Sequence, residues 1–157
     1  MSQTDFDFLV GEWDVKNRRR TRILAEDDTW YRFDAVATAR PLWNGLGNTD
    51  EIVADETPVG PVRGATVRLY DEATGLWRLY WASARDGRIG EPVVGGFENG
   101  VGRFYGHEVL DSRAVFVRYI WDAIAPGACR WQQAFSPDGG ATWETNWVME
   151  FARRASR

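Results

Sequence analysis

The chain has 157 residues, of which 44% are hydrophobic and 27% charged, so it is large enough to bury one core without disulfide or metal staples. Its formal net charge of −4 provides no general positive field, which argues against a nucleic-acid partner or an anionic membrane surface. Cys129 and His107 are each alone, which excludes an intrachain disulfide and multi-histidine metal sites, and we expect no cofactor.

The N-terminal stretch predicts a short helical turn rather than a targeting signal. It reads MSQTDFDFLVGEW, with no basic region and no apolar stretch of signal-peptide length. No apolar run in the chain approaches the roughly 20 residues of a membrane-spanning helix. We therefore expect a cytoplasmic protein that contacts no membrane, with a helical turn at Thr4–Leu9 capped by Thr4 or Asp5.

The rest of the chain alternates between turn signals, such as Asp86-Gly87 and Asn99-Gly100, and short runs rich in β-branched and aromatic residues. We predict about ten strands, at Glu12–Leu24, Thr29–Ala39, Gly45–Ala54, Thr66–Tyr70, Leu76–Ser83, Val93–Phe97, Val101–Tyr105, Ala114–Trp121, Arg130–Phe135 and Thr142–Phe151. Only Asp55–Gly64 is a long loop. One all-β domain over residues 1–157 follows, as a single closed antiparallel barrel, because closure removes exposed sheet edges.

Arginines crowd the first predicted strand, in the run Asn17-Arg18-Arg19-Arg20-Thr21-Arg22. A basic run of this kind can bind nucleic acid, but the chain as a whole is acidic. We interpret these arginines as solvated side chains that protect a sheet edge from aggregation.

The segment Ser136–Trp143 matches the pattern S-x-D-x-G-x-T-W at every position. Asp138 is suited to accept backbone N–H bonds across the turn, so we interpret it as a turn former and not as a catalytic acid. The segment resembles the Asp-box of sialidase propellers, where the box recurs in each blade. Here it occurs once in full, with a weak echo at Tyr70–Trp77, which argues against a propeller.

A second motif is Phe6–Trp13, where Gly11-Glu12-Trp13 follows the predicted helical turn. This start resembles that of calycin barrels, meaning lipocalins and their fatty-acid-binding and nitrobindin relatives. The resemblance implies that Trp13 packs across the closed end of the barrel against Arg153 or Arg154 of the last strand.

The chain as a whole is similar to small bacterial lipocalin-like proteins of unknown function, through the segments Phe8–Trp13, Arg68–Trp81 and Arg130–Trp147. The resemblance implies the barrel fold and brings no established activity. Haem-binding relatives place a histidine on iron, but no such motif surrounds His107, which we interpret as an ordinary strand residue.

Alternation along the strands predicts an aromatic pocket with a few polar groups. If Asp71 pairs with Leu76, then Arg68, Tyr70, Trp77, Leu79 and Trp81 share one face. An inward Arg68 then needs a carboxylate partner or a bound anion, because an unpaired buried charge is very costly. The last strand presents Trp143, Thr145, Trp147, Met149 and Phe151 on its apolar face, with Glu144 and Asn146 opposite. Strict alternation turns Arg118 toward water, yet we keep it among the ligand-binding candidates, which are Arg68, Trp77, Trp81, Arg118, Trp131, Gln133 and Trp147.

This pocket predicts a protein that binds a mostly apolar small molecule through an anionic or carbonyl group held by Arg68. One alternative is a cofactor-free enzyme of the isomerase or cyclase type, for which Glu144 and Tyr80 are the only acid or base candidates and no catalytic residue is assigned. Another is a purely structural or interaction domain. A carboxylate or tyrosine beside an inward arginine favours the enzyme, and a filled or wholly apolar cavity favours binding or structure. Association into a homodimer stays open.

Overall fold

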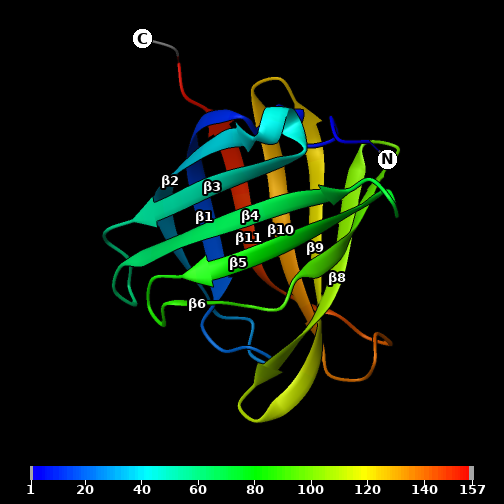
Figure 1. Cartoon of the computed structure of the whole chain (residues 1–157). Coiled ribbons are helices and arrows are strands. Elements are labelled where there is room, and N and C mark those ends of the chain that lie inside the picture. Colours follow the sequence, from blue (N-terminus) through cyan, green and yellow to red (C-terminus); the bar gives the residue numbers. More distant parts are fainter. Residues whose placement is uncertain (1, 156–157) are drawn as a thin grey trace.

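Residues 2–155 of the computed structural model form a closed antiparallel β-barrel (Figure 1). Ten strands make the ring, in which neighbours along the chain are neighbours in space, and the pairing of β1 with β11 completes the circle. The ring strands are β1 (Gly11–Arg20), β2 (Trp30–Leu42), β3 (Gly47–Ala54), β4 (Val62–Asp71), β5 (Leu76–Ser83), β7 (Val93–Glu98), β8 (Val101–Leu110), β9 (Arg113–Ala125), β10 (Ala128–Ser136) and β11 (Glu144–Arg153). The predicted fold class is confirmed.

Predicted and observed strands differ mainly at their ends. Strand β1 stops at Arg20 rather than Leu24, because Leu24 and Glu26 adopt positive φ angles of 55° and 53° that a strand does not accept. The predicted loop Asp55–Gly64 is shorter, since β4 already begins at Val62. The sequence did not indicate β6 (Arg88–Ile89), a two-residue strand that pairs with the end of β5.

The predicted helical turn is present but short. It is a 3₁₀ turn, η1 (Asp7–Leu9), and no side chain caps it, so the predicted capping by Thr4 or Asp5 is wrong. The Asp5 carboxylate instead accepts a hydrogen bond from the Ser2 backbone N–H. A second 3₁₀ turn, η2 (Trp43–Gly45), joins β2 to β3, and neither turn is long and apolar enough to cross a membrane.

The arginine run lies in the middle of the sheet. Strand β1 is hydrogen-bonded to β2 on one side and to β11 on the other, so the interpretation of these arginines as edge protection is wrong. Closure of the ring has removed the edge. Arg18, Arg19 and Arg20 are all partly buried and contact tryptophan rings.

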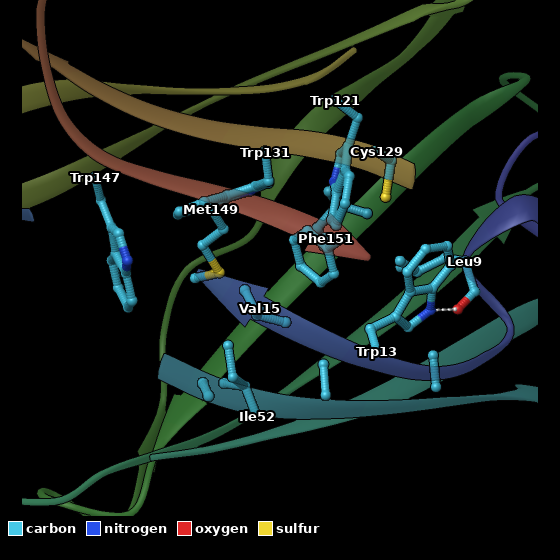
Figure 2. Packing of buried hydrophobic residues seen from close by; sticks show 14 of the residues in the cluster. Leu9, Trp13, Val15, Ile52, Trp121, Cys129, Trp131, Trp147, Met149 and Phe151 are labelled. Carbon is cyan, nitrogen blue, oxygen red and sulfur yellow. Dashed lines mark hydrogen bonds between the residues drawn. The ribbon is translucent and has the colours of Figure 1, made fainter. Parts of the chain in front are cut away.

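The motif Gly11-Glu12-Trp13 closes one end of the barrel, the upper end in Figure 1. Trp13 is fully buried, and its indole N–H donates to the Leu9 carbonyl at 2.9 Å (Figure 2). The Arg153 guanidinium lies 4.2 Å from the centre of the Trp13 ring, which confirms the contact implied by the calycin resemblance and selects Arg153 over Arg154. Gly11 has a φ of 130°, and a Cβ at this position would clash with the Arg153 guanidinium, so the arginine requires the glycine.

Aromatic rings fill the barrel below this closed end. Phe6 inserts from the N-terminal segment, with ring centres 5.0 Å from Trp77 and 4.9 Å from Phe97. Figure 2 shows the cluster continuing along β1 and β11 from Trp13 to Trp147 at its far side. The loops that follow β1, β8 and β10 lie at the opposite, lower end of the barrel in Figure 1, and we call this end the mouth.

A β-bulge changes the predicted face of β11. Gln133 pairs with Trp147 and Ala134 pairs with Thr145, which leaves Asn146 as an extra residue. Trp147, Met149 and Phe151 face the core as predicted. Beyond the bulge the alternation is broken: Asn146 is fully buried, and Trp143 packs outside the barrel against Tyr105. The placement of Trp143 on the apolar face and of Asn146 opposite it is therefore wrong.

Candidate functional site

A small internal cavity of about 50 Å³ lies in the middle of the barrel. Five of the seven predicted ligand-binding residues line it: Arg68, Trp81, Trp131, Gln133 and Trp147. They come from β4, β5, β10 and β11, and the Asp71–Leu76 pairing that places Arg68 beside the β5 tryptophans is present as predicted. The cavity has room for a few water molecules or for the polar end of a small ligand, and is well below the usual size of a small-molecule site.

Arg68 is the charged centre of this cavity, with only 3% of its surface exposed. Its Nη1 donates to Asn48 Oδ1 at 2.9 Å, and its Nη2 lies 3.3 Å from Asp50 Oδ1. This second contact is an ion pair without the alignment of a hydrogen bond, so Asp50 Oδ1 has no hydrogen-bond partner within residues 2–155. Arg68 Nε also has none there. Arg68 and Asp50 compensate each other's charge while keeping some capacity for hydrogen bonds.

Asp50 therefore takes the place of the bound anion that an inward Arg68 could have required. Sequence reasoning required either a protein carboxylate or a bound anion beside an inward Arg68, and the structure supplies the carboxylate. A bound anion is not needed to neutralise this arginine. Asp50 was not among the predicted site residues, although the alternation Asn48-x-Asp50-x-Ile52 within Gly45–Ala54 places it on the same face as the apolar Ile52.

Three tryptophans separate the cavity from the mouth. The Trp147 ring lies edge-on to Trp81 and Trp131, with ring centres 6.2 Å and 5.4 Å apart, and its N–H donates to Asn17 Oδ1 at 2.9 Å. A Cβ at Gly64 would clash with the Trp81 indole, so this glycine makes the space in which the ring lies. Trp81 remains partly exposed and forms a wall of both the cavity and the mouth.

Two open cavities of about 630 and 540 Å³ make up the mouth. Arg19, Ile23, Trp81 and Trp147 line both. The first also contains Arg20, Arg63 and Arg85, and the second contains Glu91, His107 and Glu108. Each is within the size range of small-molecule sites, and together they offer aromatic surface, cations and carboxylates to a ligand.

The other two predicted ligand-binding residues lie elsewhere. Trp77 is fully buried at the closed end against Phe6 and Tyr70, where it belongs to the core rather than to the cavity. Arg118 is on the outer face of β9, with its guanidinium 4.7 Å from the centre of the Trp143 ring. Strict alternation predicted this outward position, and the structure does not bring Arg118 together with Arg68.

Neither acid–base candidate of the sequence enters the cavity. Glu144 accepts the Leu24 backbone N–H at 2.8 Å and lies 3.7 Å from Arg20 Nε, so it fastens the loop after β1. Tyr80 alternates with the inward Leu79 and Trp81 and therefore points outward. Asp50 and Tyr119 take their place among the cavity residues. Burial raises the pKa of the Tyr119 phenol, which keeps it protonated at neutral pH.

The remaining polar residues singled out in the sequence have structural surroundings. Asp138 accepts bonds from the Thr142 N–H and hydroxyl, which lower the pKa of its carboxyl to about 2, as expected of a turn former. His107, in β8, packs its ring against Phe116 of β9. Burial raises the pKa of the Cys129 thiol to about 12. Within residues 2–155 no three His, Cys, Asp or Glu side chains group in a way that holds a metal ion.

No protein-family model matches the chain, and neither does any curated protein. Solved structures do: a redesigned beta barrel superimposes with a TM-score of 0.51 over 99% of this chain and 98% of its own. The two sequences are 10% identical, so this likeness concerns the fold alone. It agrees with the ring of strands seen here, and the chain is an all-β protein whose ten-stranded barrel closes on itself.

Proposed function

We propose that the barrel binds a mostly apolar small molecule that carries an anionic or carbonyl group. The observation that carries this proposal is the continuity of the aromatic walls. Trp81 and Trp147 line the internal cavity and both parts of the mouth, so the same rings border the open mouth and the cavity that holds Arg68. The mouth has the volume for the body of a ligand, and the internal cavity has room for its end.

A relationship to the lipocalin-like proteins is part of this proposal. Its support is the closed ten-stranded barrel together with the packing of Trp13 between Leu9 and Arg153. One end of the barrel is thereby closed by the chain itself. A ligand then enters through the mouth.

Native mass spectrometry of the freshly purified protein tests whether a small molecule co-purifies with it. A fluorescence titration with the uncharged probe N-phenyl-1-naphthylamine complements it, using the variants Trp81→Ala and Trp143→Ala. We expect Trp81→Ala to weaken probe uptake and the matched control Trp143→Ala to leave it unchanged, because Trp143 packs outside the barrel. No co-purified molecule and no probe uptake, or equal effects of the two variants, would favour the structural or interaction alternative.

A cofactor-free enzyme is the second candidate, and one observation favours it. Asp50 and Tyr119 line the cavity beside Arg68, and a carboxylate or tyrosine beside an inward arginine favours an enzyme. Asp50 is the base in this alternative, and Tyr119 is a neutral hydrogen-bond donor. If mass spectrometry identifies a ligand, incubation with Asp50→Asn and wild-type protein tests it: conversion by the wild type alone supports catalysis, and an unchanged ligand in both refutes it.

A further inference from the structure

Arg19 is a cation at the mouth for which residues 2–155 supply neither an ion pair nor a hydrogen-bond acceptor. It lies near the end of β1, opposite Trp147 of β11 and Tyr31 of β2. Its guanidinium carbon is 4.4 Å from the centre of the Trp147 ring. Within residues 2–155 it forms no ion pair and donates no hydrogen bond, so all of its N–H groups keep their capacity for a ligand.

The neighbouring arginines are already engaged. Arg20 donates to the Thr145 and Asp27 carbonyls at 2.8 Å each and pairs with Asp28 at 3.2 Å. Arg63 pairs with Asp55 at 2.9 Å. Arg85 makes one long bond, 3.5 Å, to the Val59 carbonyl. These side chains add positive charge to the same part of the mouth, but Arg19 is the one that lies over an aromatic ring and makes no ion pair or hydrogen bond within residues 2–155.

The carboxylates of the mouth compensate Arg19 only weakly. Glu91 and Glu108 line the second part of the mouth, and neither lies within ion-pair distance of Arg19. Although Glu108 keeps contact with solvent, the packing around it raises the pKa of its carboxyl, and Arg19 offsets only part of this effect. Glu108 thus carries its charge less readily than a free glutamate.

We propose that Arg19, and not Arg68, binds the anionic group of the ligand. This inference rests on the proposed function, and it specifies the ligand as a flat apolar molecule with a carboxylate, sulfonate or similar anion. The anion contacts Arg19, and the apolar body lies beside Trp81 on the way into the barrel. Asp50 already neutralises Arg68, so a second negative charge placed deep in the cavity would meet repulsion from Asp50.

Two fluorescent probes with the same body test this assignment. 8-Anilinonaphthalene-1-sulfonate carries a sulfonate, and N-phenyl-1-naphthylamine lacks it. A charge-assisted contact of this kind is worth about 1.5–3 kcal/mol, so we expect the wild type to bind the sulfonate probe about tenfold more tightly or better. Arg19→Gln should remove this preference, so that the variant binds the two probes with similar affinity. Added salt should weaken binding of the sulfonate probe alone.

Arg118→Gln is the matched control, because the Arg118 guanidinium also lies over a tryptophan, 4.7 Å from the centre of the Trp143 ring, but outside the barrel. It should keep the preference for the sulfonate. Equal affinity of the wild type for both probes, or a preference that survives Arg19→Gln, overturns the assignment while small-molecule binding stands. Uptake of neither probe defeats the proposed function itself. Circular dichroism of each variant confirms that the barrel is folded.

Discussion

The two ends of the barrel each hold an arginine on a tryptophan, but the two arginines differ in their hydrogen bonds. At the closed end, Arg153 lies 4.2 Å from the Trp13 ring and donates to the carbonyls of Phe8, Val10 and Pro126 at 2.7–3.0 Å. At the mouth, Arg19 lies 4.4 Å from the Trp147 ring and donates to no acceptor within residues 2–155. Nearly equal cation–π geometry thus serves two purposes. Arg153, with three hydrogen bonds, fastens the N-terminal segment to the barrel. Arg19, which donates none within residues 2–155, is available to a ligand.

Trp13→Ala is expected to have the largest effect on stability. The side chain is fully buried, and truncating a large buried aromatic costs about 3–5 kcal/mol of unfolding free energy. Urea unfolding followed by circular dichroism measures this loss. Probe binding by the protein that remains folded should not change, because Trp13 is far from the mouth (Figure 2). An unchanged unfolding free energy would show that this end of the barrel is not held by Trp13.

Arg68→Met is expected to lower the unfolding free energy by about 3 kcal/mol, because it leaves the buried Asp50 carboxylate without its cation. This value is at the lower end for a broken buried ion pair, since the cavity can admit water to the carboxylate. The double variant Arg68→Met/Asp50→Leu removes the stranded charge and should be more stable than the single variant. A double variant that is less stable than Arg68→Met would contradict the coupling between the two residues.

Arg153→Gln should cost about 1–2 kcal/mol, because three hydrogen bonds to backbone carbonyls at the rim of the closed end are lost. Thermal and urea unfolding of the variant measure the loss. Arg154→Gln is the control: within residues 2–155 the Arg154 side chain pairs with one residue, the exposed Asp14, and its removal should have little effect. Equal stabilities of the two variants would show that the three hydrogen bonds of Arg153 stabilise the fold no more than the surface ion pair of Arg154 does.

Asp138→Asn should alter the acid sensitivity of the protein. The pKa of the Asp138 carboxyl is lowered to about 2, so its ionised form stabilises the folded state. This stabilisation is complete above the ordinary pKa of aspartate, near pH 4, and is lost as the pH falls from about 4 to about 2. The melting temperature of the wild type should therefore fall faster across this range than that of the variant. Parallel curves for the two proteins would show that the hairpin hydrogen bonds contribute nothing to acid stability.

Arg19→Gln is expected to have the smallest effect, a change in unfolding free energy within about 0.5 kcal/mol. It removes no hydrogen bond and no ion pair, and the lost cation–π contact is at the partly exposed mouth. Measured beside Arg153→Gln under the same conditions, it tests the comparison directly. A loss as large as that of Arg153→Gln would indicate that Arg19 has a structural role.

Local patterns were sufficient to predict the strands and the barrel, and the resemblance to calycin barrels implied its closed end. Leu76–Ser83 is the observed β5, the turn after Asp71 sets the predicted register, and the calycin resemblance at Gly11–Trp13 implied the contact with the last strand. Each of these depends on residues close in sequence or on a motif with a fixed position. Such signals survive folding because hairpin geometry and strand alternation are local properties.

The candidate site was predicted only in part, because its chemistry depends on contacts between distant strands. Asp50 and Arg68 belong to adjacent strands with a long loop between them, and only the β3–β4 register brings them together. The bulge at Asn146 places Trp143 outside the barrel, and no residue type predicts such an insertion. Arg19 was classed with the solvated arginines because the sequence does not reveal that Trp147 lies opposite it.

Strands β1 and β11 come from opposite ends of the described chain, yet they are neighbours in the ring. The other ring pairings join strands that follow each other closely and can form as hairpins soon after synthesis. Until the segment Glu144–Arg153 leaves the ribosome, β1 and β10 are open edges, and Trp13 and Trp131 lack their neighbouring strand. Open edges recruit strands from other chains, so the nascent barrel is exposed to aggregation until β11 is in place. This exposure ends in one step, when β11 fills the gap between β1 and β10.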